Sequence, residues 1–188
     1  MRNDVYIIHG SYGSSKANWF PWMKQELEKI NCRVIVPDFP TPENQNINSW
    51  LEVFFKYQGE LNNNSILIGH SIGAAFVLNI LERINLPIKA SFLVAGFVGL
   101  LDKAKFDEVN KTISDKQFDW NKIKQNCKNF YLYHSDNDPY VPLTKAQELA
   151  INLETEIKLI KGAGHINKDS GFNEFKLLLD DISSLIKN

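Results

Sequence analysis

The sequence has few of the features that mark disulfide-rich, membrane or nucleic-acid-binding proteins. Its two cysteines, Cys32 and Cys127, are too few for a disulfide framework, so we expect buried free thiols. No apolar run approaches the roughly 20 residues of a membrane-spanning helix. The 21 Lys and Arg are scattered and balanced by 22 Asp and Glu, which indicates no surface for nucleic acid or anionic lipid. We expect a soluble cytoplasmic protein that binds neither.

The chain is long enough for one sizeable hydrophobic core, so we expect one domain over 1–188. Short β-branched runs alternate with longer amphipathic stretches, a pattern typical of parallel βα units. The expected strands are 5–9, 33–37, 65–69, 90–95, 130–134 and 156–161. The expected helices are 18–30, 49–61, 71–84, 143–153 and 172–186. This pattern predicts an α/β fold with a six-stranded, mostly parallel sheet flanked by helices. The stretch 96–120 mixes apolar and charged residues without a clear period, and we interpret it as a small cap.

A serine motif follows the third expected strand. Gly69-His70-Ser71-Ile72-Gly73 lies between an apolar run and the start of an amphipathic helix, as in a nucleophile elbow. The serine of an elbow sits on a sharp, strained turn, and small residues two positions away let the strand and the helix approach each other. The bare motif occurs by chance in roughly one chain of this length in fifteen, so its context carries the prediction. The alternative is that Ser71 only caps the helix.

A nucleophilic serine needs a base, and the base needs an orienting acid. The polar loop after the strand 130–134 offers two acids, Asp136 and Asp138. We favour Asp138, because its position three residues before Val141, where the next helix starts, matches the familiar hydrolase loop. We expect Asp136 to form an Asx turn instead.

A histidine follows the last expected strand, so the residues occur in the order Ser, Asp, His. In Gly162-Ala163-Gly164-His165 the two glycines permit the backbone excursion that would bring an imidazole over Ser71. We therefore predict His165 as the base. The other three histidines, His9, His70 and His134, are expected to be structural.

An oxyanion hole takes two backbone N–H groups, one from the residue after the nucleophile and one from the loop after an earlier strand. We predict Ile72 as the first donor. The glycine-containing loop after the first strand supplies the second, and we favour Ser11, with Tyr12 as the substitute. Neither spacing of the phosphate-binding glycine motifs is present in this loop.

Five segments together resemble one family: His9-Gly10, Trp19-Phe20-Pro21-Trp22, Gly69-His70-Ser71-Ile72-Gly73, Asp138-Pro139-Tyr140-Val141-Pro142 and Gly164-His165. They resemble the small α/β hydrolases of the retinoblastoma-binding protein nine and YdeN-like group, over essentially the whole chain. The resemblance implies that Ser71, Asp138 and His165 form a triad, that the absence of the early strands of larger hydrolases is normal, and that the activity is hydrolysis of an ester or related acyl bond. Ile72 departs from the leucine of many relatives, which a backbone donor tolerates.

The aromatic residues allow two interpretations. For Trp19 and Phe20, on the first expected helix, core packing is the favoured role. The alternative is a small apolar acyl pocket near Ser71, formed by Tyr12, Trp19, Phe20, Phe97 and Trp120 under the cap. Such a pocket would suit a small-molecule acyl substrate.

Two other function classes compete with a serine hydrolase. A metal-dependent hydrolase would have to gather four histidines from four separate loops, because no closely spaced ligand pair is present, and we expect neither a metal nor another cofactor. A protein-binding module that keeps the hydrolase fold without turnover is the other alternative. A protein partner cannot be read from the sequence.

Overall fold

The computed structural model describes residues 2–187 and is built on a six-stranded sheet in which every neighbouring pair is parallel. The strands are β1 (Asp4–Ile8), β2 (Arg33–Ile35), β3 (Ser65–His70), β4 (Ala90–Val94), β5 (Phe130–Ser135) and β6 (Ile157–Ile160). They lie in the order β2-β1-β3-β4-β5-β6. The expected α/β fold with a six-stranded sheet is confirmed, and the sheet is parallel throughout.

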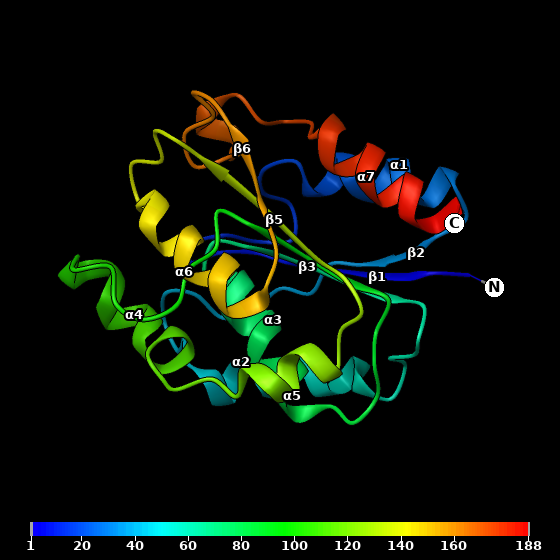
Figure 1. Ribbon diagram of the computed structural model, residues 1–188, viewed down its shortest axis with the longest axis horizontal. Helices are drawn as coiled ribbons and strands as arrows, with labels where there is room; N and C mark the ends of the chain where they lie inside the picture. Colours follow the sequence, from blue (N-terminus) through cyan, green and yellow to red (C-terminus); the bar gives the residue numbers. More distant parts are fainter. Residues whose placement is uncertain (1, 188) are drawn as a thin grey trace.

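Helices cover both faces of this sheet (Figure 1). They are α1 (Phe20–Lys29), α2 (Ile47–Gln58), α3 (Ile72–Arg83), α4 (Ala104–Ser114), α5 (Trp120–Gln125), α6 (Leu143–Leu153) and α7 (Lys176–Lys187), with a short 3-10 helix, η1 (Lys168–Ser170). Helices α1 and α7 lie together on one face, and α2, α3, α5 and α6 lie on the other (Figure 1). The helices lie in the crossovers between parallel strands, because the chain must return to the same end of the sheet before the next strand begins.

The two faces of the sheet bury two separate apolar clusters. Along β1, Val5 and Ile7 pack toward α1 and α7, whereas Tyr6 and Ile8 pack toward α2 and α3. All five residues of this strand are buried. A strand buried on both sides reads as a continuous apolar run because successive side chains point to opposite faces, which is why the strands were visible in the sequence.

Helix α3 is the most deeply buried helix, because ten consecutive residues from Ile72 to Leu81 are buried. It packs against the sheet on one side and contacts α4 and α5 on others. A helix that is apolar around most of its circumference belongs in a core. The helix that follows Ser71 is therefore held rigidly, and so is the turn that precedes it.

Three expected elements differ from the structure. The helix expected at 49–61 begins and ends two to three residues earlier, at Ile47–Gln58. The last helix begins at Lys176 instead of near residue 172, because η1 and Gly171, with a φ of 88°, hold the preceding chain in a turn. The expected cap, 96–120, contains the regular helix α4, whose Ile113 is fully buried in the core. The segment is therefore anchored in the apolar cluster that also contains residues of α2 and α3.

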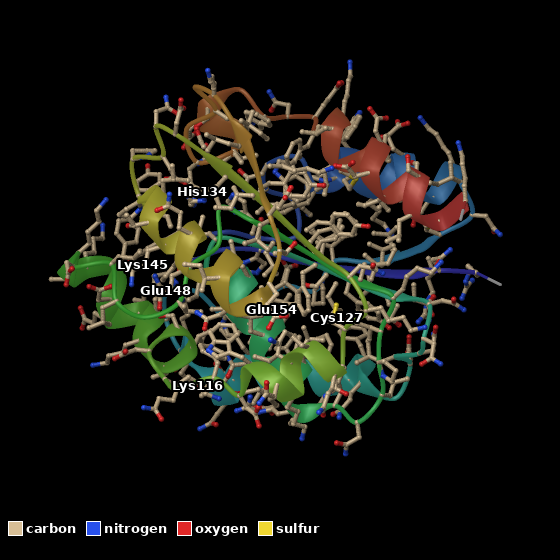
Figure 2. All side chains as sticks on the ribbon, in the orientation of Figure 1. Lys116, Cys127, His134, Lys145, Glu148 and Glu154 are labelled. Carbon is tan, nitrogen blue, oxygen red and sulfur yellow. The ribbon has the colours of Figure 1, made fainter. Side chains whose placement is uncertain are left out.

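The two cysteines are free thiols, as the sequence predicted. Cys32 and Cys127 are free and buried, and Cys127 lies on the segment that enters β5 (Figure 2). Within residues 2–187, no helix combines the length and the apolar character needed to cross a bilayer.

Candidate active site

Ser71 lies on the turn between β3 and α3, at the carboxyl end of the sheet. The strand order changes direction here, since the chain passes from β1 outward to β2 and then back to β3 on the other side of β1, and such a switch point is where parallel sheets bind ligands. Ser71 has φ 57° and ψ −125°, a conformation that L-residues adopt only under constraint. Its N–H donates to the carbonyl of Val94 at 2.9 Å, and its own carbonyl accepts from Ala74 at 3.0 Å.

The glycines on either side of Ser71 are required by packing. A Cβ atom on Gly69 would lie 2.5 Å from the carbonyl oxygen of Gly73, and a Cβ on Gly73 would lie 2.5 Å from the carbonyl oxygen of Ile8. Both distances are far inside van der Waals contact with rigid backbone. The spacing of the motif therefore has the steric cause that the elbow interpretation requires.

The loop after β1 closes against the serine. A Cβ on Gly10 would lie 2.9 Å from the Cβ of Ser71, so the backbone of this loop passes directly beside the expected nucleophile. Ile72 is the first residue of α3, a position whose N–H has no partner within its own helix. The N–H of Tyr12 already donates to Thr41 Oγ1 at 2.7 Å. Of the two residues proposed from the sequence for this loop, Ser11 therefore stays the candidate for the second donor.

Asp138 and His165 meet beside Ser71. Asp138 follows β5, His165 follows β6, and the Nδ1 atom of His165 lies 2.7 Å from Asp138 Oδ2. The side chain of Asp138 is 1% exposed and that of His165 is 8% exposed. His165 and Ser71 line the same pocket. The structure thus brings the three residues together at one edge of the sheet.

Three hydrogen bonds hold the acid loop and the histidine loop side by side. Asp136 Oδ1 accepts from the N–H of Gly162 at 2.8 Å. Ser135 Oγ accepts from Ala163 at 2.9 Å, and Asn137 Oδ1 accepts from Gly164 at 2.8 Å. The Asx turn expected at Asp136 is wrong: Asp138 Oδ1 forms the turn by accepting from Tyr140 and Val141, while Asp136 reaches across to the other loop.

The surroundings of Asp138 keep it ionised. Burial acts to raise the pKa of this carboxyl, but the hydrogen bond and charge of His165 and the N–H groups of Val141 and Tyr140 outweigh it, so the pKa lies below its ordinary value. An ionised carboxylate accepts the Nδ1 hydrogen of His165. The other ring nitrogen, Nε2, is then the one free to accept a proton.

His70 and Trp19 hold the backbone of the histidine loop. The Nε2–H of His70 donates to the carbonyl of His165 at 3.0 Å, and the indole N–H of Trp19 donates to the carbonyl of Ile166 at 3.0 Å. The rings of Trp19 and Phe20 both pack edge-on against His70. The sequence favoured structural roles for these residues. Their contacts hold the backbone of the loop that carries His165.

The buried His70 makes stability depend on pH. Burial, followed by the nearby His165, lowers the pKa of His70 to about 3 from 6.5. Between these values only the unfolded chain binds the proton, so the free energy of unfolding contributed by this group is complete above pH 6.5 and falls as the pH decreases. At pH 5.5 the loss is on the order of 1 kcal/mol.

We expect His70→Gln to remove that part of the acid sensitivity. Urea unfolding at pH 7.5 and at pH 5.5 measures it: the drop between the two pH values should be about 1 kcal/mol smaller in the variant than in the parent. The comparison is insensitive to a uniform loss of stability, because each protein is its own reference. An identical drop in both proteins would show that His70 is not held neutral.

The remaining histidines, His9 and His134, form hydrogen bonds with backbone groups. His9 donates from Nδ1 to the carbonyl of Gly10 at 2.8 Å and accepts from the N–H of Phe39 at 2.9 Å. His134, at the end of β5 (Figure 2), lies 3.0 Å through Nε2 from the carbonyl of Val141. In the part of the chain from 2 to 187, no three His, Cys, Asp or Glu residues gather closely enough to hold a metal ion.

A pocket of about 290 Å³ opens beside Ser71. Tyr12 and Phe97, expected there, line it, together with Leu101, Phe106 and Tyr140. The Phe106 ring bridges those of Tyr12 and Tyr140, at centroid distances of 6.2 and 5.6 Å. Aromatic side chains therefore form one wall and the rim.

Three residues offered as pocket candidates do not line this pocket. Trp19 and Phe20 are fully buried in the cluster under α1 and α7, because α1 turns these rings toward the sheet. Trp120 opens α5 and lines a separate hollow beside Phe118, because α5 packs next to α3 and α6. The favoured interpretation, core packing, is correct for Trp19 and Phe20, and their alternative as pocket residues is wrong.

Sequence reasoning missed Asn110. This residue of α4 is 3% exposed and lines the pocket. Its side chain accepts hydrogen bonds from Ser11 and from Gln45. The stretch 96–120 lacked a clear apolar period, so no sequence signal showed which face of α4 would turn toward the site.

Comparison with known proteins agrees with this architecture. A family model described as "Serine hydrolase" matches residues 5–183. The Bacillus subtilis protein YdeN is 30% identical over 187 residues, which cover 98% of this chain and 96% of YdeN. The serine hydrolase RBBP9 of Rattus norvegicus is 26% identical over 183 residues, covering 96% of this chain and 94% of RBBP9.

Solved structures show the same likeness. The crystal structure of the Bacillus subtilis ydeN gene product superposes with a TM-score of 0.92 at 28% identity, covering 99% of this chain and all of that one. A meta-cleavage product hydrolase from Pseudomonas fluorescens superposes with a TM-score of 0.69 at 17% identity, covering 97% of this chain and 91% of that one. The second likeness concerns the fold alone.

Proposed function

Because the chain belongs to the serine hydrolase family, we propose that it cleaves a small ester or related acyl bond, with Ser71 as nucleophile, His165 as general base and Asp138 as the residue that orients His165. The observation that carries the proposal is the 2.7 Å contact between His165 Nδ1 and Asp138 Oδ2 in the wall of the pocket that also holds the strained Ser71. A serine that only caps a helix would need neither His165 nor Asp138 beside it.

The reaction proceeds in two halves. His165 Nε2 takes the hydroxyl proton as Ser71 Oγ attacks the carbonyl carbon, and the N–H groups of Ile72 and Ser11 stabilise the oxyanion. His165 then gives the proton to the leaving oxygen, the bond to the leaving group breaks, and an acyl-Ser71 intermediate remains. Water attacks this intermediate with His165 again as base, which releases the acid and restores Ser71.

The ionised Asp138 stabilises the imidazolium that forms in each half of the reaction. It accepts the Nδ1 hydrogen throughout and does not need to take the proton itself. The depressed pKa of Asp138 supports this role, because a neutral acid would not stabilise the charge.

The pocket supports a small-molecule substrate. Its volume of about 290 Å³ lies just below the usual range of ligand sites, about 300–1,000 Å³. Leu101 and Phe106, from the segment 96–120, line it. A short acyl group fits this space better than a long chain.

Hydrolysis of p-nitrophenyl esters tests the proposal. We expect turnover to fall as the acyl chain lengthens from four carbons to twelve, because the pocket is short. We also expect the rate to be unchanged after exhaustive treatment with a chelator. Loss of activity on chelation, restored by Zn²⁺, would instead support a metal-dependent hydrolase.

A further inference from the structure

A chain of side-chain hydrogen bonds joins the loop after β1 to the cap helix α4. The N–H of Tyr12 donates to Thr41 Oγ1 at 2.7 Å, and the Thr41 hydroxyl donates to Gln45 Oε1 at 2.6 Å. Gln45 Nε2 donates to Ser11 Oγ at 2.9 Å and to Asn110 Oδ1 at 2.7 Å. The Ser11 hydroxyl also donates to Asn110 Oδ1, at 2.6 Å.

The direction of this chain orients the Asn110 amide. The Thr41 hydroxyl accepts from the N–H of Tyr12, which can only donate, and gives its own hydrogen to Gln45 Oε1. The Nε2 group of Gln45 faces Ser11 and Asn110 and donates to both. With two donors directed at it, the oxygen Oδ1 of Asn110 faces Ser11 and Gln45, and the Nδ2 group faces away from them.

The Nδ2 group of Asn110 is open to the pocket. Within residues 2–187, no hydrogen bond engages this nitrogen, although the residue is only 3% exposed. This unbonded nitrogen is not completely enclosed by protein atoms. Asn110 lines the pocket. The amide therefore reaches the cavity from a fixed direction, beside the apolar side chains of Leu101 and Phe106.

An amide donor in such a place needs an acceptor when a substrate displaces water. Leaving a buried N–H unpaired costs about 1–3 kcal/mol, so a purely hydrocarbon acyl group would be penalised. Asn110 contacts Ser11, the residue on the oxyanion side of the site, whereas the leaving group receives its proton from His165. The amide thus faces the acyl part of a bound ester.

We propose that the Nδ2 group of Asn110 donates a hydrogen bond to an oxygen atom in the acyl group of the substrate, so that the preferred substrates are esters of short ether, hydroxy or oxo acids. This inference rests on the proposed function. It makes Asn110 a residue that determines acyl specificity, and Gln45 and Ser11 the residues that hold its amide in position.

Matched pairs of esters test the inference. In p-nitrophenyl butyrate and p-nitrophenyl methoxyacetate one CH₂ replaces one oxygen, and p-nitrophenyl pentanoate and 3-methoxypropanoate form a second pair with the oxygen one atom farther out. The measured quantity is the ratio of kcat/KM for the oxygen-containing ester to that for the hydrocarbon ester. We expect Asn110→Leu to lower this ratio about tenfold for at least one pair.

Two further variants separate donation from positioning. Asn110→Asp keeps an oxygen acceptor for Ser11 and Gln45 but has no N–H, so at pH 8 its ratio should fall as in Asn110→Leu. It also serves if the leucine variant does not fold. Asn152→Leu removes a helical asparagine that lines a different hollow and should leave the ratio unchanged.

One result would overturn the inference while leaving the proposed function intact: an unchanged ratio for both pairs in the folded Asn110 variants. If kcat/KM itself also falls equally for all four esters, Asn110 acts only by positioning Ser11. If the parent protein hydrolyses none of the four esters, the proposed function itself fails, and this inference fails with it.

Discussion

Ser71→Ala is expected to lower kcat/KM for p-nitrophenyl butyrate by at least about 10⁴-fold. The variant has no hydroxyl to form an acyl intermediate, so only binding and the oxyanion donors can still favour attack by water. The backbone of the turn should persist, because Gly69 and Gly73 and the bond from the Ser71 N–H to Val94 do not depend on the hydroxyl. Steady-state kinetics on the purified variant measure the effect.

An exposed serine provides the matched control. Ser184 lies on α7, and its hydroxyl donates to the carbonyl of Asp180 one turn earlier. Ser184→Ala should retain the activity of the parent. Circular dichroism and thermal unfolding establish that both variants are folded. A folded Ser71→Ala protein with more than a tenth of the parent activity would contradict the assignment of the nucleophile.

Asp138→Asn is expected to lower kcat by about 10³–10⁴-fold with little change in the fold. An asparagine can present its NH₂ group to His165 Nδ1, which would place the imidazole hydrogen on Nε2, the nitrogen that must accept the proton of Ser71. The loss of the carboxylate charge also removes the group that stabilises the imidazolium. Burst and steady-state kinetics at pH 8 measure the change.

Asp136→Asn is the control, because it tests the neighbouring acid in the same loop. Asp136 accepts a single hydrogen bond, from the N–H of Gly162, and an amide oxygen can accept the same bond. Activity should stay within a few-fold of the parent. If Asp136→Asn lost activity by powers of ten and Asp138→Asn did not, the assignment of the acid would be reversed.

The centre of the sheet was predictable because its strands are buried on both faces. Residues 4–8 and 65–70 are all buried, so each strand appears as an apolar run bounded by turn residues. The strained turn at Ser71 was also predictable, since its causes are local: glycines at fixed spacing, a strand before them and a helix after them. Helix ends were less accurate, as at α7, because η1 and Gly171 delay its start through bonds that the apolar pattern does not show.

The parts of the site that depend on contacts between distant segments were not predictable. Asn110 lies 99 residues from Ser11, and their hydrogen bond follows from how α4 packs on α3. Aromatic residues gave a misleading signal, because the core of this protein is rich in them. The sequence favoured core packing for Trp19, but only the direction of α1 decided between the core and the pocket.

Labelling with a fluorophosphonate probe tests most directly whether Ser71 is an activated nucleophile. The purified parent protein is incubated with the probe beside Ser71→Ala and His165→Ala, and the modified residue is identified by peptide mass spectrometry. The account predicts rapid, stoichiometric labelling of Ser71 that is absent in both variants. A folded parent protein that stays unlabelled would contradict it and would favour a binding module that has retained the hydrolase fold.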